Sequence, residues 1–167
     1  MLVQNPIPED LCKYSKASDL CSHKILWIGR IAKGKRPCDA IEIFKIIKKS
    51  VEDAELEIVG TGDENLLEQM RSLCHMAGIE DAVHFHGYQQ NVVPFYAGAA
   101  LMLMTSEKEG YPTVFLESKA YGVPCVMYDL PYLSMVEDRK GFLSAEIGDV
   151  SLMAEHIIKL LRDEELR

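Results

Sequence analysis

Apolar stretches of strand length alternate with segments of helical periodicity along most of this chain. Mainly apolar runs of strand length predict six strands, at residues 25–28, 56–59, 83–85, 101–104, 124–127 and 142–144. Apolar residues that recur every three to four positions predict helices beginning near residues 37, 64, 91, 113, 132 and 149. Strands without apolar–polar alternation belong to parallel sheets that carry helices on both faces. The pattern therefore predicts an α/β fold with a doubly wound, mostly parallel Rossmann-like sheet.

Residues that start or stop helices support these boundaries. They are Pro37, Asn91 and either Asp149 or Ser151 at N-termini, and Gly78 and Gly122 at C-termini. Residues 1–22 show no periodicity and contain Asn5-Pro6-Ile7-Pro8, which is typical of a linker. We therefore expect a linker over residues 1–22 and one folded domain over residues 23–167.

Composition and charge argue against several classes of protein. The chain has no run of 18 uncharged apolar residues, and its start lacks the basic and apolar segments of a signal peptide. The net charge of −8 argues against a nucleic acid partner, because proteins that bind phosphate backbones carry a basic face. Five cysteines without a Cys-x-x-Cys pair indicate a reduced, cytoplasmic chain that uses cysteine as a small core residue.

Two groups of polar residues raise the question of a ligand. Four basic residues fall within seven positions: Arg30, Lys33, Lys35 and Arg36. That cluster indicates either a site for a small anion or a solvated turn. His84 and His86 alternate, as two side chains on one face of a strand would. Because the pattern supplies two ligands without an acidic or cysteine partner as a third, the histidines do not predict a metal site.

Three loops with unusual residues follow the first, second and fourth predicted strands. Ligands of such sheets bind at the carboxyl ends of the strands, so we expect the loops to meet at one edge. The first loop supplies Arg30 and Lys35. The guanidinium of an arginine can donate two hydrogen bonds side by side and the ammonium of a lysine is a compact charge, so the two together suit a diphosphate. The second, Gly60-Thr61-Gly62, permits close approach of a ligand or simply makes a turn. The absence of Gly-x-Gly-x-x-Gly argues against a dinucleotide site.

The third loop leads into Glu109-Gly110-Tyr111-Pro112-Thr113-Val114-Phe115-Leu116-Glu117. Its glycine-to-threonine segment lies at the N-terminus of the next helix, where free N–H groups and the helix dipole favour phosphate. Glu109 and Glu117, eight positions apart, can accept hydrogen bonds from sugar hydroxyls. Spacing alone slightly favours the alternative, in which Glu117 is a solvated helix residue and Glu109 complements the helix dipole.

Together these motifs resemble the C-terminal domain of retaining glycosyltransferases with the two-domain GT-B architecture, in glycosyltransferase family 4. The resemblance covers roughly residues 24–163. It rests on Ile28-Gly29-Arg30 with Lys35, the Glu-x-seven-Glu pair, the run Leu116-Glu117-Ser118-Lys119-Ala120-Tyr121-Gly122-Val123-Pro124, and Gly141-Phe142-Leu143. The segment Tyr128-Asp129-Leu130-Pro131-Tyr132 resembles members that make bacterial capsule and cell-wall polysaccharides.

The resemblance implies a function for each matching residue. Arg30 and Lys35 would bind the diphosphate of a nucleotide-sugar donor, and Glu117 would hold the ribose hydroxyls. Glu109 would face the donor sugar as the catalytic residue. The other donor-binding residues implied are Gly60, Gly110, Tyr111, Pro112, Thr113 and Val114. No metal or other cofactor is implied, because the basic pair takes the place of a metal, and transfer retains the anomeric configuration.

The sequence departs from the family pattern at two positions. Pro112 stands where the family often has glycine, and its missing N–H removes any contact of that group with phosphate. Ser118 replaces a usual alanine.

The family also needs an N-terminal domain that binds a glycan or lipid-linked acceptor. We therefore expect this chain to be an excised donor domain, of a protein able to associate peripherally with the inner face of the membrane. The alternatives are a sugar-nucleotide epimerase half-domain, which can share the architecture, and a non-catalytic nucleotide-sugar-binding module. The presence of both Glu109 and Glu117 argues against the module.

Overall fold

A computed structural model describes residues 22–131, 133, 140–163 and 165–166 of the chain. Within them, one six-stranded parallel sheet has the order β3-β2-β1-β4-β5-β6. The strands are β1 (Lys24–Ile28), β2 (Glu55–Val59), β3 (Val83–Gly87), β4 (Leu101–Met104), β5 (Cys125–Tyr128) and β6 (Phe142–Ala145). The order reverses between β1 and β4, as it does in Rossmann-like domains. The predicted fold class is confirmed.

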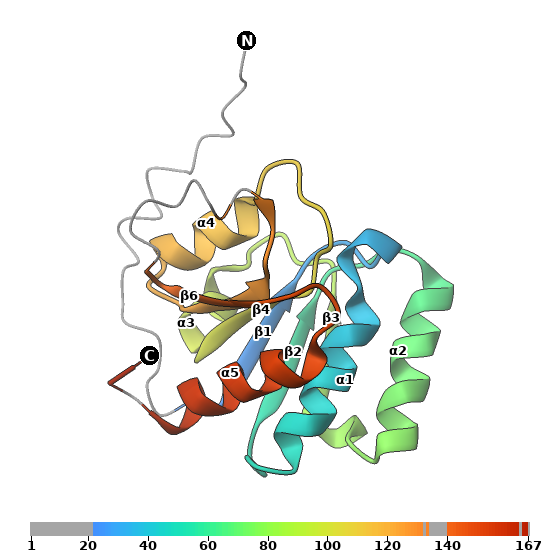
Figure 1. Cartoon of the computed structure of the whole chain (residues 1–167). Helices are drawn as coiled ribbons and strands as arrows, with labels where there is room; N and C mark the ends of the chain where they lie inside the picture. Colours follow the sequence, from blue (N-terminus) through green and yellow to red (C-terminus); the bar gives the residue numbers. More distant parts are fainter. Residues whose placement is uncertain (1–21, 132, 134–139, 164, 167) are drawn as a thin grey trace.

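Helices cover both faces of the sheet (Figure 1). One face packs against α1 (Pro37–Lys48), α2 (Glu64–Ala77) and α5 (Val150–Arg162), and the other against α3 (Val93–Gly98) and α4 (Thr113–Ala120). Two short 3-10 turns, η2 (Lys33–Lys35) and η3 (Glu80–Ala82), also lie within the described residues.

Successive residues of the central strands enter opposite cores. In β4, Leu101 and Leu103 pack into the core under α1, α2 and α5, whereas Met102 and Met104 pack into the core under α3 and α4. All four are at most 5% exposed. Side chains of this size each contribute about 1.5–3 kcal/mol when they are fully buried. Burial on both faces is the reason that the sequence is continuously apolar there.

The capping residues act largely as predicted. Asp149 caps α5 by accepting a hydrogen bond from the N–H of Leu152 at 2.9 Å, so it begins this helix rather than Ser151. Gly78 takes a left-handed conformation, with φ of 63°, directly after α2. Asn91 accepts a hydrogen bond from the N–H of Val93 at 3.1 Å, but the N-cap residue of α3 is Val92, so Asn91 lies one residue before the cap position.

Some predictions fall on residues outside the described ranges. These are the linker before Ser22, Cys12, Cys21, and all but one residue of the helix predicted over 132–136. Among the remaining cysteines, Cys74 and Cys125 are buried and free. Burial raises the pKa of the Cys74 thiol to about 11, as expected for a core cysteine. In the portion of the chain that the structure describes, every helix is too short or too polar to cross a membrane.

Candidate functional site

The loops that follow β1 and β4 are bound to each other at the point where the strand order reverses. Thr105, fully buried just after β4, accepts a hydrogen bond from the indole N–H of Trp27 at 3.0 Å. The Thr105 hydroxyl donates in turn to the backbone carbonyl of Lys35 at 2.8 Å. The N–H of Glu107 donates to the carbonyl of Gly34 at 3.0 Å. These bonds fix the first loop, because breaking them would leave buried polar groups unpaired.

This arrangement brings together two of the predicted site residues. The ammonium of Lys35 donates to Oε1 of Glu109 at 2.5 Å, across 74 positions of sequence. The Lys35 side chain is 28% exposed and that of Glu109 is 11% exposed, so solvent screens the pair only partly. A cation and a carboxylate therefore share one place beside the carboxyl ends of β1 and β4.

Arg36 belongs to the scaffold of this loop. Its Nε donates to Asp39 at 2.7 Å, and Nη1 lies 3.6 Å from a carboxylate oxygen of Glu107. Tyr128 donates its hydroxyl to the same Asp39 at 2.6 Å, and its ring lies 6.0 Å below the Arg36 guanidinium. Burial, and then the hydrogen bond to Asp39, raises the pKa of Tyr128, which keeps this hydroxyl a donor. Of the four clustered basic residues, Arg36 thus has structural partners that sequence alone did not indicate.

Arg30 lies in a separate pocket of about 440 Å³ at the ends of β1 and β2. The pocket is also lined by Gly60 and by Tyr88 and Gln89 from the loop after β3. Arg30 is exposed, and its guanidinium forms no ion pair with any other residue that the structure describes. It is therefore available to an anion. Tyr88 is 75% exposed, and sequence reasoning missed it because exposure of a loop aromatic leaves no periodic signal.

Gly60 is explained by contact between two backbones. Its φ is 137°, and a Cβ on it would lie 1.9 Å from the carbonyl oxygen of Gly29. The two loops continue the pairing of their strands here, because the N–H of Gly29 donates to Val59 at 3.0 Å and that of Ile31 to Thr61 at 2.9 Å. Of the two interpretations of this turn, close chain packing accounts for the glycine, and Gly60 also lines the Arg30 pocket.

The remaining predicted donor-binding residues surround the start of α4. Gly110 and Tyr111 are exposed, with Tyr111 45% exposed, and Thr113 and Val114 are half-buried. Pro112 is the N-cap residue and supplies no side-chain cap. The N–H of Thr113 donates to the carbonyl of Tyr111 at 2.9 Å. The other N–H groups of the first turn of a helix have no acceptor within the helix.

Glu117 has a partner different from that of Glu109. The hydroxyl of fully buried Tyr96 in α3 donates to Oε2 of Glu117 at 3.0 Å, and the Tyr96 ring stacks on Tyr121 at 4.7 Å. Burial, and then the charge of Glu117, raises the pKa of Tyr96, so the phenol stays protonated and orients the carboxylate. The structure thus pairs Lys35 with Glu109 and Tyr96 with Glu117, and it leaves Arg30 exposed in a pocket of its own.

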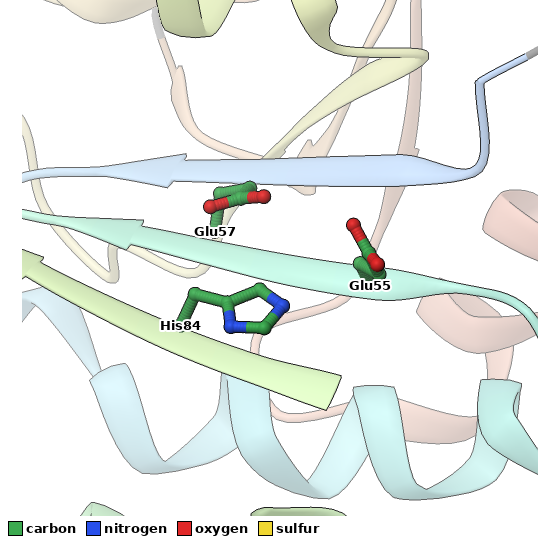
Figure 2. Close-up of side chains that lie close together, drawn as sticks. All are labelled: Glu55, Glu57 and His84. Atoms are coloured by element: carbon green, nitrogen blue, oxygen red, sulfur yellow. The ribbon is translucent and has the colours of Figure 1, made fainter. Parts of the chain in front are cut away.

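A second group of titratable side chains lies on the sheet face, over β2 and β3. Glu55, Glu57 and His84 gather there (Figure 2). Lys24 lies 3.2 Å from Glu55 and 3.3 Å from Glu57, and His86 is hydrogen-bonded to Glu57. Burial alone would raise the pKa of Glu57, but these two partners lower it overall. The carboxylates that sequence analysis did not find beside the histidines come from the neighbouring strand.

Comparison with known proteins identifies the family. The model of the family described as glycosyl transferases group 1 matches residues 14–167. The chain belongs to this family. N-acetyl-alpha-D-glucosaminyl L-malate synthase of Bacillus anthracis is 40% identical over 151 residues, which are 87% of this chain and 38% of the relative. Poly(glycerol-phosphate) alpha-glucosyltransferase of Bacillus subtilis is 28% identical over 144 residues, 85% of this chain and 21% of the relative. This member of the family thus spans well under half of either relative.

Solved structures share the fold. S. aureus TarM, solved with UDP and alpha-GlcNAc-glycerol, superposes with a TM-score of 0.83 over 92% of this chain and 31% of TarM, at 21% identity. The C-terminal domain of a group 1 family protein from Francisella tularensis gives a TM-score of 0.78 at 18% identity. That superposition covers 93% of this chain and 89% of the other, so a domain of this extent is also known as a separate structure.

Proposed function

We propose that this chain is the donor-binding domain of a retaining GT-B glycosyltransferase of family 4 that uses a nucleoside-diphosphate sugar. The observation that carries the proposal is the Lys35–Glu109 pair at the reversal of strand order, beside the start of α4. Open α/β sheets bind ligands at such reversal points. A cation for the leaving diphosphate and a carboxylate for the sugar are then adjacent, as transfer of a glycosyl group requires.

Each group has a distinct task in the proposed reaction. Lys35 and Arg30 stabilise the negative charge that develops on the diphosphate as the glycosidic bond breaks, together with the N–H groups at the start of α4. Glu109 faces the donor sugar, and Glu117, oriented by Tyr96, accepts from the ribose hydroxyls. Fixed cations perform the charge stabilisation that a metal would otherwise supply, so the proposed transfer needs no cofactor.

The acceptor belongs to a region of the protein beyond this domain. The chain covers 38% of the Bacillus anthracis relative, and the names of several relatives refer to poly(glycerol-phosphate), capsule or lipopolysaccharide synthesis. We propose a glycan or lipid-linked acceptor of a bacterial surface polysaccharide, bound by an N-terminal domain, with the full-length protein at the cytoplasmic face of the membrane. Transfer needs both reactants held together, so the 167-residue chain should bind donor without turnover.

The test separates the two members of the ion pair. Calorimetric titration with UDP and with UDP-sugars, starting from the nucleotide bound to TarM, compares the wild type with Lys35→Ala and Glu109→Gln. Lys35→Ala should weaken both ligands about ten- to a hundred-fold, because a charge-assisted contact is worth roughly 1.5–3 kcal/mol. Glu109→Gln frees Lys35, so UDP should bind as well as before or several-fold better, while the preference for the sugar-bearing form disappears.

Lys33→Ala is the matched control for these variants. Lys33 is an exposed cation two residues from Lys35, and its removal tests net charge alone. Equal losses in Lys33→Ala and Lys35→Ala would assign the effect to general electrostatics and reject the diphosphate site. Equal losses of UDP and UDP-sugar in Glu109→Gln would reject the sugar-facing position of that carboxylate.

A further inference from the structure

We propose that Glu55, Glu57 and His84 form a binding site for one divalent cation of the zinc class, on the sheet face and apart from the donor site. One ligand atom from each of the three side chains lies within 4.8 Å of the other two. Figure 2 shows the side chains gathered over the neighbouring strands β2 and β3. The set combines one imidazole nitrogen with two carboxylate oxygens, which are ligands that zinc accepts.

The strand register places these ligands without help from any loop. Glu57 pairs directly with His84 in the parallel ladder between β2 and β3. Glu55 stands two residues before Glu57, and side chains two apart in a strand lie on the same face. A site on rigid strands needs little reorganisation to bind. A tetrahedral ion would bring its ligands to about 3.4 Å from one another, so small side-chain rotations suffice to close the site.

A cation already lies between the two carboxylates. The ammonium of Lys24 is 3.2 Å from Glu55 Oε2 and 3.3 Å from Glu57 Oε1. The Lys24 side chain is 48% exposed, so its flexible stem can turn the ammonium into solvent when another cation arrives. Without it, two carboxylates and a neutral imidazole carry a charge of −2, which a divalent ion neutralises. Lys24 is thus the competitor of the metal rather than a ligand.

His86 is a positioning residue for this site. It is hydrogen-bonded to Oε2 of Glu57, the oxygen that Lys24 does not contact, and so orients the carboxylate. Partners of this kind typically change metal affinity ten- to a hundred-fold. Beside them is a pocket of about 210 Å³, lined by Lys24, Glu57, His86 and Phe95 among others.

Occupation of the site would join two strands by their side chains. In the described sheet, β3 is an outer strand whose partner is β2. A metal held by Glu55 and Glu57 from β2 and by His84 from β3 would cross-link that edge. We therefore assign the cation a stabilising function.

Cobalt(II) titration of the full 167-residue chain tests the site, because Co²⁺ replaces Zn²⁺ and reports its ligands by absorption. We expect one equivalent with the d–d bands of tetrahedral nitrogen and oxygen ligation, and without the charge-transfer band of thiolate. Added Zn²⁺ should displace it and raise the thermal midpoint of unfolding. Glu55→Gln and His84→Gln should each weaken binding at least tenfold, and His86→Gln about tenfold, with circular dichroism confirming the fold.

Two further variants make the test decisive. Lys24→Met removes the competing ammonium and should strengthen binding several-fold, an effect that misfolding would not produce. His75→Gln is the control, because His75 forms a similar pair with Glu80 at 3.2 Å on the surface of α2 and should leave the titration unchanged. A thiolate band, equal affinity in all variants, or no binding in either the wild type or Lys24→Met would overturn the proposal.

Discussion

At the carboxyl edge of the sheet, backbone contacts join the loops that follow β1 and β2. Most of the bonds between the loops that follow β1 and β4 instead involve a side chain. In the first, the Gly29 and Gly60 backbones approach so closely that no Cβ fits at Gly60. In the second, Thr105 bridges Trp27 and Lys35, and Lys35 reaches Glu109. A ligand can replace one side chain as the partner of another, but it cannot move apart two backbones that are packed against each other. The comparison therefore predicts a rigid pocket around Arg30 and an adjustable ion pair around Lys35.

Substitution of Gly60 should have the largest effect on stability. Gly60→Ala places a Cβ 1.9 Å from the Gly29 oxygen at a φ of 137°, which L-residues rarely adopt. Backbone strain of this kind costs about 1–3 kcal/mol, and the overlap adds to it, so we expect a loss of at least about 3 kcal/mol in the free energy of unfolding. Urea denaturation measures it. Gly34→Ala in the same region has open space around the new methyl and should change stability by less than about 0.5 kcal/mol.

Loss of the threonine bridge should have an intermediate effect. Thr105→Val leaves the buried Trp27 N–H without its acceptor and the Lys35 carbonyl without its donor, at a cost of about 1–3 kcal/mol. Thr61→Val, an exposed threonine of the loop after β2, serves as control and should be nearly neutral. A double-mutant cycle with Trp27→Phe should recover a coupling energy. If the two substitutions lower the free energy of unfolding additively, the Trp27–Thr105 hydrogen bond does not hold the two loops together.

Removal of Arg30 should barely change stability. Arg30 is exposed and unpaired among the described residues, so Arg30→Ala should alter the free energy of unfolding by less than about 0.5 kcal/mol. Affinity for UDP should nevertheless fall about ten- to a hundred-fold, because the lost contact is charge-assisted. Thermal unfolding with and without UDP measures both quantities. Destabilisation without loss of affinity would place Arg30 in the scaffold, as Arg36 is.

The elements of the fold were predictable because each carries a local signal. The run Leu101–Met104 is apolar at every position, and Asp149 and Gly78 mark helix ends with their own side-chain or backbone chemistry. Predicted strand boundaries therefore lie within two residues of the observed ones. The left-handed backbone of Arg36, with φ of 45°, has no such signal, because arginine is not a residue that marks this conformation in a sequence.

The candidate site was predictable as a set of residues rather than as an arrangement. Glu109 and Lys35 were both identified, yet their pairing depends on two loops 74 positions apart. The basic residues form one cluster in the sequence. In the folded chain, however, Arg36 is hydrogen-bonded to Asp39, whereas Arg30 is exposed. The sequence did not link His84 to Glu57, which stands opposite it in β2, because a parallel strand brings in residues from far along the chain. Such pairings become visible only with the sheet order.

The pairing of the β1 and β2 loops beyond their strands also limits how the sequence can vary. Hydrogen bonds continue from Gly29–Val59 through Ile31–Thr61 to Asp63, whose N–H donates to the carbonyl of Ile31 at 2.8 Å. The side chain of Asp63 then caps α2. A one-residue deletion in either loop would shift every later partner and pull the helix start out of place. Compensating deletions in both loops would be needed to restore the match. Natural variation in these two segments should therefore occur by substitution, with their lengths conserved together.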